Sequence, residues 1–278
     1  MRTLKTFRRL VAVAALGCAN AFAGPVILGG DDLNDHGSFN GTANLQGWLY
    51  IQNALSNLVA QSTRPGNTGR IAVLGATPGS TSCEAVVRPA QIVGPQVDCI
   101  DTAAALTTFF AQLAAGTVNP TVLVYPGDGA SGGVDSAEEA VLATNAGAIA
   151  AFVASGGGLL GHDGPYTWLA TLLPGISSNN PCDESNAVLT PAGVAAFPLV
   201  TNTDIRSGPC HLTFSGNLGG LQVLAIDTNG RPLIIGGGAT TTITPGAPQQ
   251  IPTLSEWGMI LMATMLAGVA ALRLRRRG

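Results

Sequence analysis

Two hydrophobic patterns alternate through the middle of the chain. Short, continuously apolar runs that end in glycine or acidic residues predict buried strands, and the longer amphipathic stretches between them predict helices. The expected strands cover residues 25–30, 70–76, 120–129 and 158–164, and the expected helices cover residues 43–61, 101–116, 136–158 and 165–173. Apolar strands that alternate with helices indicate an α/β fold in which helices cover both faces of a mostly parallel sheet.

Several local signals predict where these elements begin and end. Asp101 is the expected N-cap and Gly116 the expected stop of the second helix, and Ser136 with Glu139 has the spacing of a capping box at the start of the third. Further on, two apolar runs within 221–238 flank the tetrapeptide Asp-Thr-Asn-Gly. Because Asn-Gly is a strong turn signal, we expect the sheet to finish in a C-terminal antiparallel hairpin.

The N-terminus has the layout of an export signal. Basic residues precede an apolar stretch at 10–17, and Ala21-Phe22-Ala23 provides the small residues that signal peptidase reads. We therefore expect residues 1–23 to be a signal peptide that is cleaved after Ala23. Lipoprotein processing at Cys18 is the alternative, although the leucine of Ala15-Leu16-Gly17-Cys18 stands one position too late for a lipobox.

The C-terminus has the layout of a membrane anchor. Residues 257–272 carry no charge, and with Leu274 they predict a transmembrane helix over 257–274. The Arg-rich tail at 273–278 is expected in the cytoplasm under the positive-inside rule, so the folded part is expected on the far side of the inner membrane.

The string IPTLSEWG (251–258), the apolar helix and the basic tail together resemble the IPTL-CTERM sorting signal. The motif residues are Ile251, Pro252, Thr253, Leu254, Trp257 and Gly258. The resemblance implies that an exosortase-type transpeptidase of a Gram-negative bacterium recognises the signal in the inner membrane, cleaves near the motif and transfers the protein to the cell surface or extracellular matrix. A plain anchor that is never cleaved is the alternative.

Removing both signals leaves an expected domain at 24–238 and a Gly/Thr/Pro-rich linker at 239–250. Eight of the 13 Lys and Arg residues lie in the removed segments, so five Arg face 15 acidic residues, a net charge near −10. This charge argues against nucleic acid as a partner, because few cations remain to neutralise phosphates.

The four cysteines outside the signal peptide form two local pairs, Cys83 with Cys99 and Cys182 with Cys210. In an exported chain these pairs predict two disulfides, each contributing roughly 3 kcal/mol in the chain-entropy description. Four buried free thiols are the alternative. No Cys/His spacing indicates zinc.

The segments TVLVYPGDG (121–129) and FVASGGGLLGHDGPYTWL (152–169) resemble the class I glutamine amidotransferase-like family. The resemblance spans roughly 25–238 and implies a flavodoxin-like three-layer sandwich, with a cysteine nucleophile at the elbow after a strand. Here the elbow is Gly161-His162-Asp163-Gly164, which has no cysteine, and His211 is not followed by the family's glutamate. Glutamine hydrolysis through a thiolate is therefore not expected.

Acidic residues and histidines follow three of the predicted strands. They are Asp31, Asp32, Asp35, His36, Asp128, His162 and Asp163. Because ligands bind beyond the carboxyl ends of parallel strands, this set predicts a site for a divalent cation such as calcium. Ordinary solvated turns are the alternative. A further alternative makes Asp163 a carboxylate nucleophile with His36, His162 or His211 as its base.

Two hypotheses for the function follow. The first is a surface-sorted envelope or matrix protein whose domain is a binding or structural module, with extracellular polysaccharide among its partners. The second is a metal-dependent or Asp-based hydrolase of extracellular polymers, which needs Asp31 or Asp32 close to Asp128 and Asp163. Tyr166 and Trp168 are expected to be packing residues rather than a platform for a sugar.

Overall fold

The computed structural model describes residues 24–127 and 131–237. The expected signal peptide, Asp128, the linker and the sorting signal with its predicted transmembrane helix lie outside the described residues. The chain divides into two compact units, Met1–Ile243 and Thr244–Gly278, and all described residues belong to the first.

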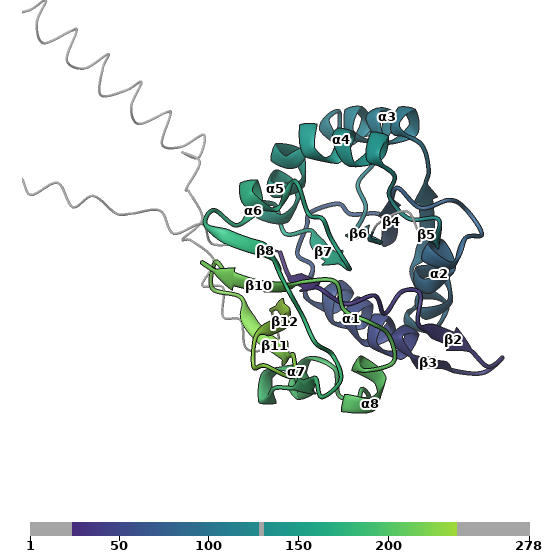
Figure 1. The fold of residues 1–278 in the computed structure, drawn as a ribbon. Coiled ribbons are helices and arrows are strands. Elements are labelled where there is room, and N and C mark those ends of the chain that lie inside the picture. Colours follow the sequence, from purple (N-terminus) through teal and green to yellow (C-terminus); the bar gives the residue numbers. More distant parts are fainter. Residues whose placement is uncertain (1–23, 128–130, 238–278) are drawn as a thin grey trace, which may run out of the picture. The chain divides into compact units, whose positions relative to one another are not determined.

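An eight-stranded sheet forms the centre of the first unit, with the strand order β5-β4-β6-β7-β1-β12-β11-β9 (Figure 1). The bounds are β1 Val26–Gly29, β4 Arg70–Leu74, β5 Gln96–Ile100, β6 Val122–Tyr125, β7 Gly158–Gly161, β9 Val188–Leu189, β11 Gln222–Ile226 and β12 Pro232–Gly236. Strands β5 to β1 in this order are parallel, and β12, β11 and β9 continue the sheet in antiparallel pairs. Strands β1, β6 and β7 are buried along their whole length, as their continuous apolar sequences predict.

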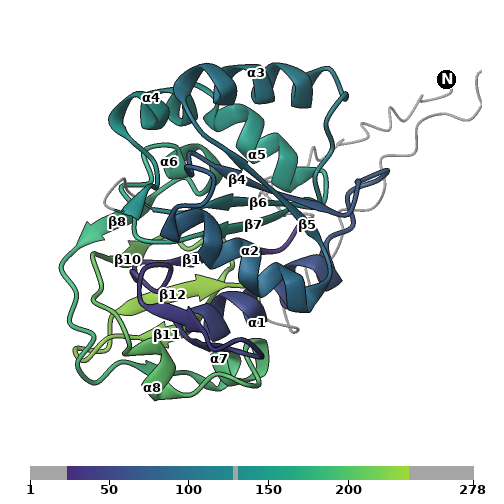
Figure 2. The same ribbon diagram turned by 90° about the vertical axis from the view of Figure 1, so that its right-hand side faces the viewer.

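Helices lie on both faces of the sheet and make three layers (Figure 2). The bounds are α1 Gly47–Gln61, α2 Thr81–Val93, α3 Ala103–Ala114, α4 Ser136–Thr144, α5 Ala146–Ala154, α6 Leu169–Leu172, α7 Pro191–Ala196 and α8 Asn202–Ile205. One hydrophobic cluster joins α3, α4, α5 and α6 to the sheet, and a second joins α1, α2, α7 and α8 to its other face. The expected α/β class is therefore confirmed.

The strand order differs from that of a flavodoxin-like fold. Numbered as they occur along the chain, the five parallel strands stand in the order 3-2-4-5-1, whereas the flavodoxin-like order is 2-1-3-4-5. Strand β1 pairs in parallel with β7 and in antiparallel with β12, which places it inside the larger sheet. Hydrophobic periodicity predicts that a strand exists but does not say which strand it pairs with.

One helix and one strand of the α/β fold, α2 and β5, have no counterpart among the predicted elements. Helix α2 contains Pro89, a residue that usually argues against a helix interior. Strand β5 is an edge strand that alternates exposed and half-buried residues instead of forming an apolar run. Both were missed because they depart from the pattern of a fully buried strand and an uninterrupted helix.

Some helix boundaries also differ from the expected ones. Residues Asn44–Gln46 form β3, which pairs with β2 (Gly37–Phe39), so α1 begins only at Gly47. Thr102, not Asp101, caps α3, since its side chain accepts a hydrogen bond from the amide of Ala105. The third predicted helix is two helices that meet at Asn145 and bend by 58°.

The capping box of α4 stands one residue earlier than predicted. Asp135 accepts from the amide of Glu138, and the Glu138 carboxylate accepts from the amide of Asp135. The sequence Asp-Ser-Ala-Glu-Glu contains two overlapping capping patterns, so spacing by itself could not choose between them.

Several other expectations are confirmed. The hairpin of β11 and β12 turns at residues 227–230, and the disulfides join Cys83 to Cys99 and Cys182 to Cys210. Tyr166 and Trp168 are packing residues, 3% and 1% exposed, in one aromatic cluster.

A second small sheet pairs β8 (Ile176–Asn180) with β10 (Thr213–Gly216).

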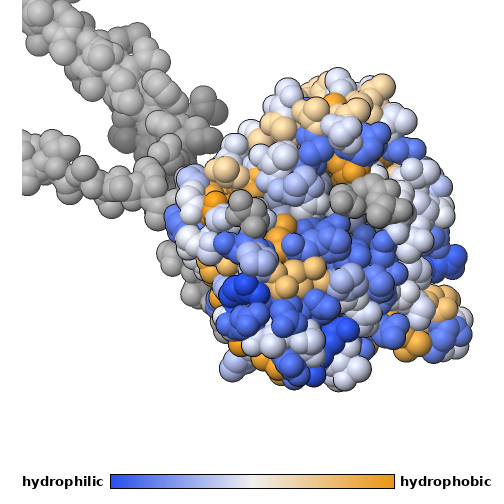
Figure 3. All heavy atoms as spheres, in the orientation of Figure 1, coloured by the Kyte–Doolittle hydropathy of each residue, from blue (hydrophilic) through white to orange (hydrophobic). Residues whose placement is uncertain are grey.

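The described surface carries few large hydrophobic side chains. Those that are exposed are Leu45, Ile92, Val194 and Leu199. On the face drawn in Figure 3, hydrophilic residues dominate the centre and the hydrophobic ones are scattered. Across residues 24–127 and 131–237, no helix taken alone has the length and apolar character needed to cross a membrane, and only the bent pair of α4 and α5 meets those criteria together.

Candidate functional site

The elbow after β7 separates two neighbouring side chains. His162 is fully buried, whereas Asp163 lies at the carboxyl edge of the sheet with φ of 65°. That backbone conformation is uncommon for a residue with a side chain. One contact holds it, since the amide of Asp163 donates to the carbonyl of Asp31 at 2.9 Å. Gly127 lies so near that a Cβ at that position would be 2.7 Å from the Cβ of Asp163.

His162 forms a buried pair with Asp31. Its Nδ1 lies 3.0 Å from Oδ1 of Asp31, and the two side chains are 0% and 2% exposed. The imidazole meets the ring of Tyr50 edge-on at 5.7 Å. Burial raises the pKa of Tyr50 well above its usual value, and the charge of Asp31 raises it further, so the phenol stays neutral. This pair belongs to the interior and does not face solvent.

Asp32, the next residue after Asp31, points to the outside of the same edge. Its Oδ2 lies 3.5 Å from Nε2 of His36, which is 41% exposed. Burial raises the pKa of the Asp32 carboxyl above its ordinary value and the neighbouring Asp35 raises it further, while His211 and His36 lower it. A cationic group near Asp32 therefore relieves an unfavourable concentration of carboxylates.

His211 reaches this edge from a distant part of the sequence. Its amide donates to the carbonyl of Gly30 at 2.7 Å, and the amide of Asp32 donates to the carbonyl of Pro209 at 3.0 Å. An isolated antiparallel bridge joins Asp31 to Cys210 between these bonds. The segment before β10 is thus laid along the end of β1.

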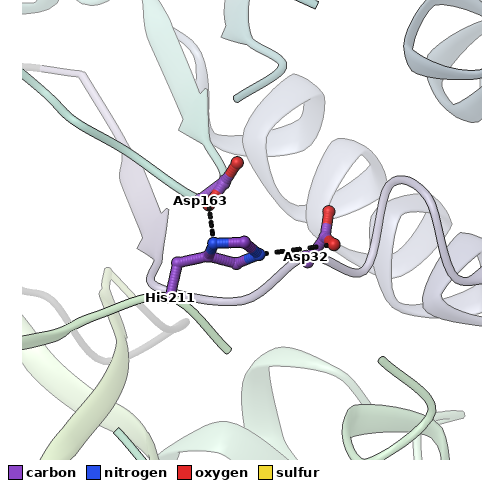
Figure 4. A group of neighbouring side chains, drawn as sticks. All are labelled: Asp32, Asp163 and His211. Carbon is purple, nitrogen blue, oxygen red and sulfur yellow. Dashed lines mark ion pairs between the residues drawn. The ribbon is translucent and has the colours of Figure 1, made fainter. Parts of the chain in front are cut away.

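Asp32, Asp163 and His211 form one cluster at the carboxyl edge. The imidazole lies between the two carboxylates, with Nδ1 3.2 Å from Oδ1 of Asp163 and Nε2 3.4 Å from Oδ2 of Asp32 (Figure 4). One ligand atom from each residue lies within 4.8 Å of the other two. Asp163 is 8% exposed, Asp32 15% and His211 44%, so the cluster is open on the imidazole side.

The structure separates the seven residues of the predicted cation site into different environments. Asp35 accepts a hydrogen bond from the hydroxyl of Ser131. Asp32 and Asp163 enter the cluster, and His36 contacts only Asp32 among them. Asp31 and His162 turn inward and pair with each other, so neither belongs to the cluster, and their role as cation ligands stays a prediction. Asp128 lies outside the described residues.

His211 was predicted only as one of three alternative bases. The adjacent Cys210, whose disulfide the spacing predicts, was the only signal that this segment is held in place. Nothing in the sequence says which strand end the segment meets. With two carboxylates on one imidazole, the cluster has the chemistry either of a metal site or of a proton relay.

Comparison with known proteins finds a match at the C-terminus. A family model described as the IPTL-CTERM motif matches residues 249–276. No curated protein and no solved structure matches the chain, and no comparison supports the amidotransferase-like resemblance. The matched motif is a C-terminal sorting signal for export to the cell surface. It supports surface sorting of this chain and implies recognition by an exosortase-type sorting enzyme.

Proposed function

We propose that this protein displays a divalent-cation-binding α/β module in the cell envelope or extracellular matrix. The observation that carries the proposal is the cluster of Asp32, Asp163 and His211, whose ligand atoms lie within 4.8 Å of one another. The three residues come from the loop after β1, the elbow after β7 and the segment before β10. A bound cation would link these three segments at the carboxyl edge of the sheet.

The donor set narrows the class of cation. Calcium prefers oxygen ligands alone, whereas an imidazole with two carboxylates suits manganese, iron or zinc. Two negative carboxylates and one neutral imidazole also match a divalent charge. We therefore favour a divalent transition ion over the calcium that the acidic residues alone suggested.

Protons compete with the cation at this site. Each nitrogen of His211 lies within ion-pair distance of a carboxylate, and a cation binds only a nitrogen or a carboxylate oxygen that carries no proton. Affinity should fall by up to about tenfold for each pH unit over which one proton must be released. Binding is accordingly expected to be tighter at neutral pH than in mild acid.

The test is a titration of the exported chain with Mn²⁺ followed by electron paramagnetic resonance. We expect one ion per chain, with binding lost in Asp163→Asn and kept in Asp98→Asn, whose carboxylate pairs with Arg70 at the edge of the sheet. Equal Mn²⁺ binding by both variants, or no binding by the wild type, would show that this cluster is not a cation site.

Sorting is tested on protein released from the surface of the native host. Intact mass should lack residues 1–23 and the segment beyond about 251, the positions that the two signals predict. Retention of the predicted helix at 257–274 would instead favour the uncleaved anchor.

An Asp-based hydrolase is the second candidate, and the backbone of Asp163 favours it. Strained conformations such as its φ of 65° gather at active sites, and His211 lies 3.2 Å away as a base. If the carboxylate is the nucleophile, it forms an ester with the matrix polymer during turnover, and rapid denaturation should trap this ester as added mass on the peptide that contains Asp163. A chain that releases no fragments from matrix polymers, or releases them equally well as Asp163→Asn, does not use this chemistry.

A further inference from the structure

We infer that the Cys182–Cys210 disulfide assembles the cation cluster, so that the site is completed only after the chain enters an oxidising compartment. The inference rests on the proposed function, because it concerns the regulation of that same site. The starting observation is that Cys210 immediately precedes His211, the one ligand that does not follow a strand of the parallel sheet.

The segment that carries His211 has little regular structure of its own. Helix α8 ends at Ile205 and β10 starts at Thr213, and a single isolated bridge joins the residues between them to the end of β1. Three main-chain hydrogen bonds accompany the bridge, from His211 and Leu212 to the carbonyl of Gly30 and from Asp32 to that of Pro209. Side chains add bonds from Arg206 to the carbonyl of Ala187 and from Ser207 to that of His36, but the segment has no continuous strand pairing and is expected to open locally at lower free-energy cost than the central sheet.

The disulfide connects this segment to a better anchored part of the fold. Cys182 lies between β8 and Asp183, and Asp183 is bound to the β11–β12 turn. The amide of Thr228 donates to the carbonyl of Asp183 at 2.8 Å, and the amide of Asp183 donates to Oδ2 of Asp227 at 3.3 Å. The bond therefore holds the residue before His211 against the rim of the central sheet.

The other disulfide provides a natural contrast. Cys83–Cys99 joins α2 to β5, and Cys83 is 4% exposed within the hydrophobic cluster of that face. No member of the cation cluster belongs to either element. Its loss should loosen the α2–β5 region and leave the position of His211 unchanged.

The covalent step is thiol–disulfide exchange with a protein disulfide of the oxidising compartment. One of the two thiols loses a proton and its thiolate attacks the donor disulfide, forming a mixed disulfide and releasing one donor thiolate. The second thiol then loses its proton, and its thiolate attacks the mixed disulfide, forming the Cys182–Cys210 bond and releasing the second donor thiolate. The two cysteines are oxidised by two electrons, the donor is reduced to a dithiol, and the two protons end on its sulfurs.

The test compares Cys182→Ser/Cys210→Ser with Cys83→Ser/Cys99→Ser in the full chain. Hydrogen exchange at the amide of His211 reports the segment without any cation. We expect exchange at least about tenfold faster in the first variant and unchanged in the second, with the amides of β6 protected in both. Slow exchange in the first variant overturns the inference. Fast exchange throughout the domain, β6 included, also overturns it, because the bond would then support the whole fold.

Reduction of the wild-type protein breaks both disulfides, so Cys83→Ser/Cys99→Ser, in which only Cys182–Cys210 is left to reduce, is treated in the same way beside it. Mn²⁺ is the probe because it prefers carboxylate and imidazole to the thiols that reduction creates. We expect its affinity to fall on reduction and to return on reoxidation, together with slow exchange at His211. If the oxidised chain takes no Mn²⁺ at all, the proposed function fails, while the exchange measurement still decides whether the disulfide places His211.

Discussion

Two aspartate–histidine contacts lie side by side at the carboxyl edge of the sheet, and they differ in every physical respect. Asp31 and His162 are buried and paired at 3.0 Å, whereas Asp32 and Asp163 share the half-exposed imidazole of His211 at 3.4 and 3.2 Å. The members of the two contacts are neighbours in sequence, 31 beside 32 and 162 beside 163. A shift of one residue at a strand end thus decides whether an ionisable group is buried within the fold or reaches the surface.

The largest expected effect comes from breaking the buried contact. Asp31→Ala should lower the free energy of unfolding by about 3 kcal/mol, because His162 is left without its partner in the interior. Urea denaturation measures the loss. Asp32→Ala is the matched control, with a change of about 1 kcal/mol or less because its carboxylate is partly exposed. Equal losses in the two variants would mean that the contacts do not differ as their burial indicates.

Removing the imidazole from the exposed contact should affect ligand binding rather than folding. His211→Ala is expected to lower Mn²⁺ affinity by more than about 100-fold, since even partners that only orient a ligand contribute about 10- to 100-fold. His36 approaches the same oxygen of Asp32 and is similarly exposed, 41% against 44%, so His36→Ala is the matched comparison. A larger loss in His36→Ala would place the cation on the other side of Asp32.

Substitution of Gly127 tests whether the position of Asp163 matters for cation binding. A Cβ at Gly127 would lie 2.7 Å from that of Asp163, and the residue has φ of 89°. Gly127→Ala should cost about 1–2 kcal/mol of stability and also weaken Mn²⁺ binding by displacing Asp163. Gly69→Ala has a similar φ of 71° but no atom within 4 Å, so it should show the backbone cost without the loss of binding. Thermal unfolding and the Mn²⁺ titration separate the two effects.

The smallest expected effect is a dependence of stability on pH. The pKa of Asp32 is raised by burial and by Asp35, so the folded state holds its proton more tightly than the unfolded state. The stabilising contribution of the Asp32 carboxyl to the free energy of unfolding is therefore fully present below its ordinary pKa of 3.8. This contribution is lost as the pH rises through the raised pKa of the folded state. Asp32→Asn should remove this fall, of less than about 1 kcal/mol, in urea denaturation at several pH values without metal. An unchanged pH profile in the variant would assign the fall to another group.

Local signals in the sequence predicted those parts of the fold that depend on nearby residues. The Asn229-Gly230 turn, the strands with continuous apolar runs and the two cysteine pairs all have signatures within about 30 residues, and the structure contains each of them. The elements that were missed have weak or contrary local signals. Pro89 interrupts the pattern of α2, and the edge strand β5 lacks an apolar run.

The candidate site was only half predictable for the same reason. Acidic residues after apolar strands indicated Asp32 and Asp163, because the carboxyl ends of parallel strands gather at one edge. The sequence offered no means to separate them from Asp31 and His162, whose side chains turn inward, since the direction of each side chain depends on where the strand ends. His211 was out of reach because its segment meets β1 only through long-range pairing.

The sequence by itself carried the sorting signal of this protein and indicated the structural class of its domain. A sorting enzyme reads a short linear motif, and buried strands and helices leave a periodic pattern of apolar residues, so both kinds of information are local. Only the tertiary structure decided the order of the strands, the inward turn of Asp31 and His162, and the meeting of His211 with Asp32 and Asp163. These depend on contacts between residues up to 209 positions apart in the numbering (Ile27 to Gly236), and packing, rather than any local preference, selects them.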